Sequence, residues 1–183
     1  MKKIVLTAVI AAAILIAAGG CGIIPSGQET AGIAYSDPQI DMAIYVGGGN
    51  WDYTKDDEIG QVYFYIPEDL GQNNVISISS VESKEDLESQ LETIWDFFRQ
   101  QVKDMSGTET GFTDITAGKY KGKELDFKMT EDNIGIDGKY LVWNTDERVY
   151  ICSATAVENG KEQVNTAIDT ILKNFQTYDD AQK

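Results

Sequence analysis

Histidine is absent from the chain, and this absence excludes more functions than any other feature of the composition. Ser-His-Asp and Cys-His catalysis both need an imidazole base, and the common zinc sites use imidazole as a ligand. Cysteine is nearly absent as well, because Cys21 and Cys152 are the only two. Cys152 lies in an apolar stretch and is expected to be a small buried hydrophobic residue rather than a nucleophile. We therefore predict a protein that is not an enzyme and has no cofactor or metal site.

Basic residues are few, with 15 Lys and Arg against 30 Asp and Glu. Nucleic-acid binding depends on Lys and Arg that neutralise phosphates, and anionic lipid surfaces also attract basic segments. The composition therefore predicts no nucleic-acid partner and no membrane contact through charge. The acidic surface favours solubility and mutual repulsion, with binding of cations or basic partners as the alternative.

Long apolar runs are also missing, with one exception at the N-terminus. Two lysines precede the apolar residues 4–18, and two glycines then lead to Cys21. A basic start, an apolar centre and small residues before a cysteine are typical of a bacterial lipoprotein signal. We expect residues 1–20 to be removed and the Cys21 thiol to carry lipid, with palmitate among its acyl chains. Two acyl chains are enough for stable anchoring, which predicts a protein on the extracytoplasmic face of the cell membrane.

The N-terminal segment has two alternative interpretations. Ala18 stands where lipoprotein signals usually have leucine, so an ordinary secretory signal cut after Ala17 or Gly20 would leave Cys21 as a free thiol. An uncleaved membrane anchor is the second alternative. Its apolar run of about 15 residues is shorter than the roughly 20 that a spanning helix needs.

The mature chain is expected to form one domain. Loss of Lys2 and Lys3 with the signal leaves 13 basic against 30 acidic residues, a net charge of −17. Residues 21–38 contain Gly, Pro, Ser and Thr without periodicity and are expected to be a flexible tether. Residues 39–178 are predicted to be a single globular domain, followed by a frayed tail, residues 179–183.

Apolar periodicity predicts an α+β domain. Alternating patterns predict strands at residues 40–46, 62–66, 75–79, 112–117, 124–129, 140–144 and 148–156. Two apolar stripes at helical spacing predict a helix that begins with a capping box at Ser83 and Asp86 and ends at Gly107, and a closing helix capped by Asn159. Turn-forming residues predict a hairpin turn within 131–138. Short connections favour an antiparallel sheet of about six or seven strands covered by two main helices.

Three stretches resemble the PsbP-like family, whose bacterial lipoprotein members include DcrB-like and other small exported domains. Residues 60–70 resemble its strand ending in a Pro-acidic turn, residues 117–123 its strand-turn-strand step, and residues 148–175 its closing strand and helix. The resemblance implies an α/β/α sandwich and an accessory or binding role without catalysis. The chain departs from the family at Leu70, where tryptophan is frequent, and in an acidic insert, residues 51–58. No functional residue is carried over.

The acidic insert is the first candidate site. Its carboxylates, with Asp37 and Asp41 nearby in sequence, are the ligand type that calcium prefers. Their spacing does not match the EF-hand calcium loop and Lys55 lies among them, so a solvated loop is expected. Trp51 follows a glycine-rich turn and is the aromatic residue expected to be exposed. The candidate ligand-binding residues are Trp51, Asp56, Asp57 and Glu58.

A pair of tyrosines is the second candidate site. Tyr63 and Tyr65 alternate with Val62 and Phe64, so they point to the opposite face of the same strand. On an open face they would line a groove that stacks on a sugar or peptide. If helices cover both faces they belong to the core, and this second interpretation is favoured.

The sequence predicts a lipid-anchored, extracytoplasmic accessory domain that binds another envelope protein. The alternative is a ligand-binding lipoprotein that holds a sugar, a peptide or a divalent cation. A hydrolase with paired carboxylates is a third hypothesis. We disfavour it because a small domain filled by its own core leaves little room for a deep substrate site.

Overall fold

The structure, a computed structural model, describes residues 32–67 and 74–183. The expected signal peptide, its lipidation site Cys21 and most of the expected tether lie outside the described residues. The strands are β1 (Ile33–Asp37), β2 (Met42–Val46), β3 (Asp52–Asp56), β4 (Gln61–Tyr65), β5 (Val75–Glu82), β6 (Thr108–Ala117), β7 (Tyr120–Glu131), β8 (Ile134–Asn144) and β9 (Arg148–Val157). The helices are α2 (Leu87–Asp104), α3 (Lys161–Asn174) and α4 (Tyr178–Ala181).

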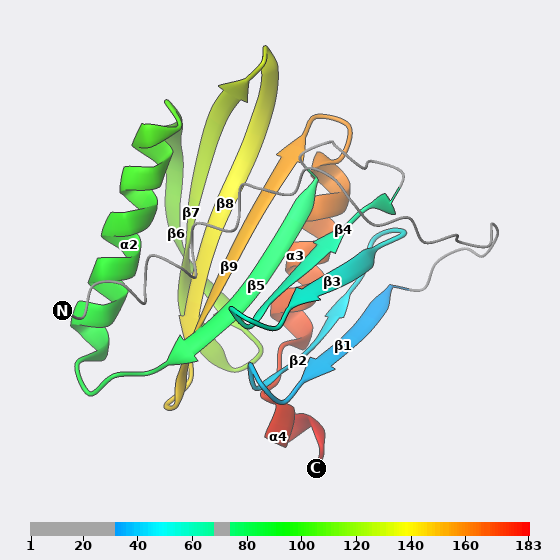
Figure 1. Ribbon diagram of the computed structural model, residues 1–183, viewed down its shortest axis with the longest axis vertical. Coiled ribbons are helices and arrows are strands. Elements are labelled where there is room, and N and C mark those ends of the chain that lie inside the picture. Colours follow the sequence, from blue (N-terminus) through cyan, green and yellow to red (C-terminus); the bar gives the residue numbers. More distant parts are fainter. Residues whose placement is uncertain (1–31, 68–73) are drawn as a thin grey trace.

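Seven strands form one antiparallel sheet in the order β3-β4-β5-β9-β8-β7-β6, and β1 pairs with β2 in a separate hairpin (Figure 1). Tight turns join several of the successive strands. Between β7 and β8 the turn residues Asp132 and Asn133 have φ angles of 49° and 67°, a left-handed backbone that Asp and Asn tolerate well. The predicted hairpin turn within 131–138 is confirmed, although β8 begins at Ile134, earlier than the strand predicted from residue 140.

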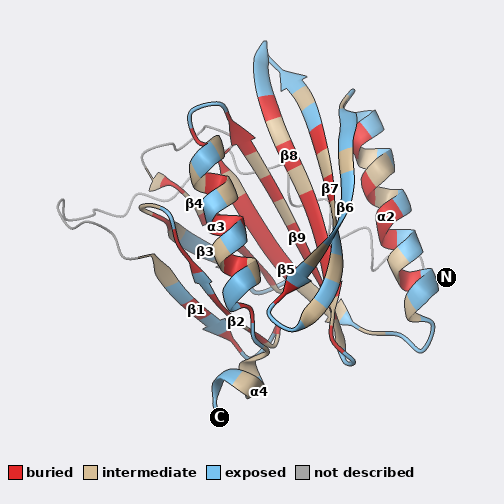
Figure 2. Cartoon of the chain, turned by 180° about the vertical axis from the view of Figure 1, so that it is seen from behind, coloured by how far each residue is buried: buried red, intermediate tan, exposed pale blue. Residues whose placement is uncertain are grey.

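Helices α2 and α3 lie on opposite faces of the large sheet (Figure 2). Successive side chains of a strand point to opposite faces, so β8 and β9 contribute to two separate cores. Trp143 and Tyr150 pack on the α3 side, where their rings stack with centroids 5.6 Å apart. Val142 and Ile151 pack on the α2 side. This arrangement confirms the predicted α+β class and an antiparallel sheet with two main covering helices.

The two faces are covered to different extents. On the α3 side the β1–β2 hairpin extends the cover, since Met42 and Tyr35 join the same core as Phe64 of β4. On the α2 side the hydrophobic cluster takes residues from β5, β7, β8 and β9 but none from β3 or β4. Figure 1 shows α2 at the end of the sheet remote from β3 and β4. One half of the α2 side is therefore not covered by any helix that the structure describes.

Three expectations from the sequence need correction. The tether does not reach residue 38, because β1 occupies Ile33–Asp37. The acidic insert is not a loop throughout, because most of it forms the edge strand β3. The tail is not simply frayed, because α4 begins at a Thr177 cap and Asp180 pairs with Lys119 at 2.8 Å.

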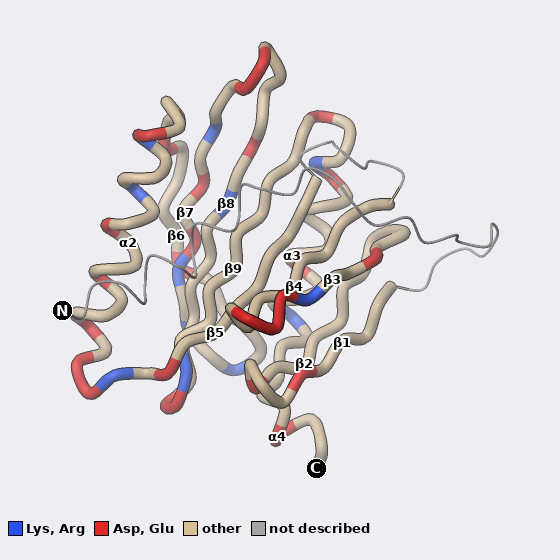
Figure 3. The backbone as a smooth tube through the Cα atoms, in the orientation of Figure 1, with Lys and Arg blue, Asp and Glu red and all other residues tan. Residues whose placement is uncertain are grey.

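The helix ends also differ from the predicted ones. The N-cap of α2 is Asp86, whose carboxylate accepts a hydrogen bond from the Ser89 backbone N–H at 3.1 Å, and Ser83 lies before the helix. The N-cap of α3 is Gly160 rather than Asn159. Charged residues occur on all three helices (Figure 3), and among the described residues no helix is both long enough and apolar enough to span a membrane.

Candidate functional site: a row of hydroxyl groups across the sheet

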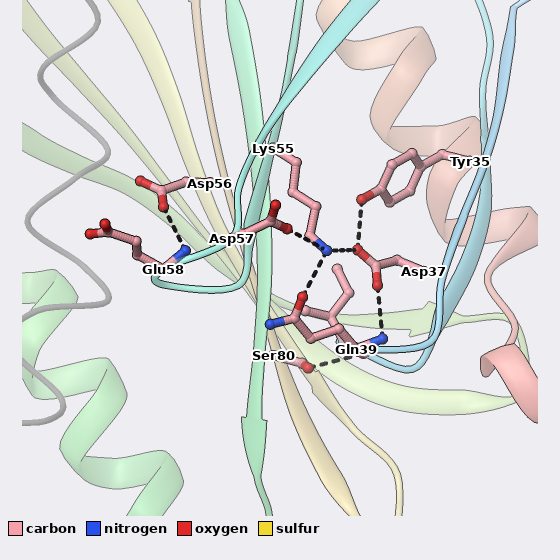
Figure 4. Close-up of polar contacts among 9 residues, drawn as sticks. Tyr35, Asp37, Gln39, Lys55, Asp56, Asp57, Glu58 and Ser80 are labelled. Carbon is pink, nitrogen blue, oxygen red and sulfur yellow. Dashed lines mark hydrogen bonds and ion pairs between the residues drawn. The ribbon is translucent and has the colours of Figure 1, made fainter.

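The acidic insert is organised around Lys55, which joins β3 to the β1–β2 hairpin (Figure 4). Its ammonium group lies 2.8 Å from Asp37 Oδ2 and 2.9 Å from Asp57 Oδ1, and it donates a hydrogen bond to Gln39 Oε1 at 2.8 Å. Asp37 also accepts hydrogen bonds from the Tyr35 hydroxyl and the Gln39 backbone N–H, at 2.9 and 2.8 Å. Lys55 therefore neutralises a buried carboxylate, which explains why a lysine stands inside an acidic segment.

Burial and hydrogen bonding act in opposite directions on the pKa of Asp37. Desolvation raises it, but the hydrogen bonds from Lys55, Gln39 and Tyr35 favour the ionised carboxylate, and the net result is a lowered pKa. The pKa of Lys55 is raised in turn by its contacts with Asp37 and Asp57. Both partners are therefore charged at neutral pH, and together they hold the hairpin against the large sheet.

The four candidate residues of the insert do not converge on one point. Trp51 is buried rather than exposed, with 5% of its surface accessible, and its indole N–H donates to the Gly47 carbonyl at 3.2 Å. This corrects the expectation of an exposed aromatic residue. Asp56 accepts a hydrogen bond from the Glu58 backbone N–H, and Asp57 is largely exposed beside its lysine partner. Within residues 32–67 and 74–183, no group of three or more carboxylate, thiol or imidazole ligands is placed to hold a metal ion.

Tyr63 and Tyr65 point to the α2 side of the sheet, away from the core that contains Val62 and Phe64. Tyr63 is buried and Tyr65 is half-buried, but neither belongs to a hydrophobic cluster. Helices cover both sides of the sheet as expected, yet the described helices do not reach the part of it that carries these tyrosines. The buried Tyr63 agrees with the favoured core interpretation, whereas Tyr65 is half-buried on the same face of the strand.

A row of hydroxyl groups crosses this part of the sheet. The strand register places one hydroxyl residue from each of five adjacent strands opposite the next, all on the α2 side. In order from β3 to β8 they are Thr54, Tyr63, Ser77, Ser153 and Tyr140. Ser77 Oγ and Ser153 Oγ are hydrogen-bonded to each other at 2.9 Å, and the Tyr140 hydroxyl donates to Gln101 Oε1 of α2 at 3.2 Å. We call these five residues the hydroxyl row.

Further polar residues lie beside the hydroxyl row. On one side Asp56, Gln61 and Ser79 are aligned across β3, β4 and β5, and on the other side Asp52 is opposite Tyr65. Gln61 is 4% exposed, and its Oε1 has no hydrogen-bond partner in the part of the chain that the structure describes. Buried polar atoms without a partner are rare in folded proteins, so this oxygen marks a place where a donor is missing.

A second polar region lies on the α3 side, between α3 and strands β7 and β8. It is a cavity of about 210 Å³ whose lining includes Asp126, Lys139 and Lys161. Lys139 lies 2.7 Å from both Glu124 and Asp126, and Lys161 lies 2.7 Å from Asp137. These charges already pair with one another. A ligand that binds in this cavity would have to compete with these ion pairs.

The thiol of Cys152 lies in the α3-side core and is 2% exposed. Burial raises its pKa, with a smaller contribution from Glu124. In a chain with Cys21→Ser, the thiol reagent DTNB should therefore label Cys152 only as fast as the protein unfolds, and at once in denaturant. Labelling of the folded chain at the rate of a small-molecule thiol would contradict this packing.

Sequence reasoning misses the hydroxyl row because the row depends on strand register. Thr54 and Tyr140 come from distant parts of the chain, and nothing in either segment indicates that three other hydroxyl residues lie between them. The alternation of Tyr63 and Tyr65 with apolar residues is the one available signal. It indicates a second face but not which residues of other strands share it.

The comparisons with known proteins agree with this fold. A structure of cyanobacterial PsbP from Synechocystis sp. PCC 6803 superposes with a TM-score of 0.61 and 16% identity, over 87% of this chain and 98% of that one. LpqN of Mycobacterium tuberculosis, which is involved in cell envelope biogenesis, gives 0.52 and 12%, over 79% and 88%. A protein of Bacteroides thetaiotaomicron gives 0.54 and 15%, over 81% of this chain, which spans about half (49%) of that longer chain.

These likenesses define the fold as PsbP-like, which confirms the resemblance inferred from the sequence. The narrower DcrB-like label is not confirmed. No family model matches the sequence, and no curated protein matches it. At such low identities the likeness concerns the fold alone, so the site has to be argued from this chain's own residues.

Proposed function

We propose that the protein is a lipid-anchored, non-enzymatic accessory domain on the extracytoplasmic face of the cell membrane, where it binds another component of the envelope. The observation that carries this proposal is the PsbP-like fold, which extends over nearly the whole of cyanobacterial PsbP and most of LpqN. The lipoprotein-type N-terminus, with Cys21 after small residues, supports the anchor.

The chemistry of the described polar groups supports a binding role rather than catalysis. The charged side chains around Lys55 and Lys139 are paired with each other and hold strands together. The thiol of Cys152 is buried in an apolar core with its pKa raised, which disfavours the nucleophilic thiolate.

Replacement of Cys21 by serine tests the anchor. We expect the full-length variant to lose lipid and to leave the membrane fraction, because the acidic chain offers no charge attraction for an anionic bilayer. Fractionation of tagged protein and mass measurement of its N-terminus provide the readout. Cys152→Ala is the matched control, since it removes the other cysteine and should leave anchoring intact. A Cys21→Ser chain that is still processed and still membrane-bound would refute the lipoprotein assignment.

The accessory role is tested by purification from native membranes. The tagged full-length lipoprotein is extracted in mild detergent, and mass spectrometry identifies proteins that accompany it in near-equal amounts. Cys21→Ser serves as the control that removes anchoring. A stoichiometric, anchor-dependent partner would support the proposal, whereas recovery of the lone domain under gentle crosslinking would count against a protein partner.

A further inference from the structure

We propose that the cavity on the α3 side binds a small zwitterion, a free α-amino acid with a short apolar side chain. This ligand would be additional to the envelope partner proposed above, and neither binding event requires the other. Three features of the cavity carry the assignment. Two groups of charged side chains at the cavity have opposite net charges, their separation matches one amino acid, and part of the lining is apolar.

The first group of charges has a cation in excess. Asp137 of β8 pairs with two lysines, because Lys161 Nζ of α3 lies 2.7 Å from Asp137 Oδ2 and Lys128 Nζ of β7 lies 3.5 Å from Asp137 Oδ1. We call these three residues the cationic group. Glu158 also attracts Lys161, but more weakly, since it is exposed and screened by solvent. Two ammonium groups that share one carboxylate leave a positive charge for a ligand carboxylate.

The second group of charges has a carboxylate in excess. Lys139 Nζ of β8 lies 2.7 Å from both Glu124 Oε1 and Asp126 Oδ1 of β7, and we call these three residues the anionic group. Lys139 and Asp126 line the cavity, and their side chains are 25% and 32% exposed, so a ligand reaches them from solvent. One ammonium group that serves two carboxylates leaves a negative charge for a ligand ammonium group.

The surplus charges favour a ligand that carries both signs. Burial lowers the pKa of Lys139, but its hydrogen bonds with Asp126 and Glu124 outweigh burial, and the net result is a raised pKa. Asp137 raises the pKa of Lys161, and Lys161 lowers the pKa of Asp137, so these groups stay charged at neutral pH. Competition with the existing ion pairs is smallest for a zwitterion, because it uses the surplus of each group and leaves the pairs in place. A singly charged ligand satisfies one group only.

The distance between the two groups suits an α-amino acid. Lys128 is opposite Asp137 in the β7–β8 register. Asp126 is opposite Lys139, two residues along the same strands, which places the groups about 7 Å apart. The ammonium nitrogen and the carboxyl carbon of an α-amino acid are about 2.5 Å apart. With a charge-assisted hydrogen bond of about 2.8 Å at each end, one molecule spans up to about 8 Å and reaches both groups at once.

The size and lining of the cavity limit the side chain of the ligand. The cavity volume of about 210 Å³ equals that of about seven water molecules and is below the roughly 300–1,000 Å³ of sites for drug-sized molecules. Ala154, Ala156 and Val164 line the cavity, and all three are buried. A short apolar side chain such as that of alanine or valine would pack on them and lose its contact with water.

The experiment uses the whole mature chain from residue 21 with Cys21→Ser, isotope-labelled for two-dimensional NMR. Alanine and valine are each titrated to about 20 mM at constant ionic strength, so that a millimolar Kd is measurable. Alaninamide, which keeps only the ammonium charge, and N-acetylalanine, which keeps only the carboxylate, are the controls. We expect the zwitterions to shift the amide signals of Gly138, Lys161 and Asn165, and to bind about tenfold more tightly than either control.

Lys161→Gln tests the cationic group. It removes the surplus cation, and Asp137 keeps Lys128 as its partner, so no carboxylate is left unpaired. Binding of alanine should weaken about tenfold, the value of one hydrogen bond to a charged group, whereas the weak binding of alaninamide should not change. Lys119→Gln is the matched control, because Lys119 pairs with Asp180 and does not line the cavity. It should leave the affinity for alanine unchanged.

Asp126→Asn tests the anionic group in the same way. It removes the surplus carboxylate while Lys139 keeps Glu124, and it should also weaken binding of alanine about tenfold. Asp114→Asn is its control, since Asp114 pairs with Lys123 and is not part of the cavity lining. The spectra themselves show whether each variant is folded.

Three results would each overturn the inference. They are the absence of shifts at the cavity with alanine and with valine, binding of either singly charged control as tightly as alanine, and an unchanged affinity in Lys161→Gln and Asp126→Asn. None of these results bears on the Cys21 anchor or on the proteins that accompany the lipoprotein from native membranes. The proposed function and this site therefore stand or fail separately.

Discussion

Phe98→Ala is expected to destabilise the domain by about 3–5 kcal/mol, the usual cost of removing a buried aromatic ring. Phe98 is 1% exposed and stacks on Tyr140 of β8, with centroids 4.1 Å apart and planes 5° from parallel. Trp95 meets it edge-on at 5.8 Å. Because the ring joins α2 to the centre of the sheet, its loss leaves a cavity that the rigid β8 cannot close. Urea unfolding followed by tyrosine and tryptophan fluorescence measures the change.

Phe97→Ala is the matched control for this prediction. Phe97 is the same residue type on the same helix, but it is half-buried at the margin of the hydrophobic cluster. Its replacement by alanine should lower the free energy of unfolding by about 1 kcal/mol. Equal losses of unfolding free energy for Phe97→Ala and Phe98→Ala would contradict the central position of Phe98 in the α2-side core.

Sequence reasoning is most successful where burial alone fixes the structure. The apolar stripe that contains Ile94, Phe98 and Val102 predicts α2. The alternation of Leu125 and Phe127 with charged residues predicts β7. Both predictions succeed because the spacing of apolar residues shows which side chains are buried on folding. β1 and β3 escape prediction for the opposite reason. β3 is polar apart from Tyr53, and β1 is a five-residue segment that ends in Ser36 and Asp37. Both become strands by pairing with β2 and β4 rather than by their own pattern.

The candidate sites follow the same rule. A cluster of acids in sequence suggests a cation site, but Lys55 reaches back to Asp37 across the β1–β2 hairpin, a contact that sequence separation hides. Trp51 is expected to be exposed because its neighbours are polar. Its ring instead packs in the α3-side core, and its indole N–H donates a hydrogen bond to the Gly47 carbonyl. The hydroxyl row needs the register of five strands, and single-strand patterns carry no register between distant segments.

Asp37→Ala is expected to lower the free energy of unfolding by about 3 kcal/mol, because a buried, charged acceptor of several hydrogen bonds is lost. The variant leaves the Tyr35 hydroxyl without its acceptor and removes the carboxylate that Lys55 neutralises. The β1–β2 hairpin should loosen first, since this contact ties it to β3. Amide hydrogen exchange should therefore quicken in β1 and β2 more than in β8 and β9.

The pH dependence of stability separates the contribution of the Asp37 charge from the contribution of its packing. Its folded pKa lies below the ordinary value of about 3.9, so the stabilisation is complete above about pH 4 and is lost as the pH falls through the lowered pKa. Asp37→Asn keeps the shape and should flatten this acid decline in thermal unfolding midpoints. Asp114→Asn is the control: Asp114 also has a lowered pKa, beside Lys123, but it is 85% exposed and water screens the pair. Equal flattening by both variants would show that burial of Asp37 is not what couples the hairpin to pH.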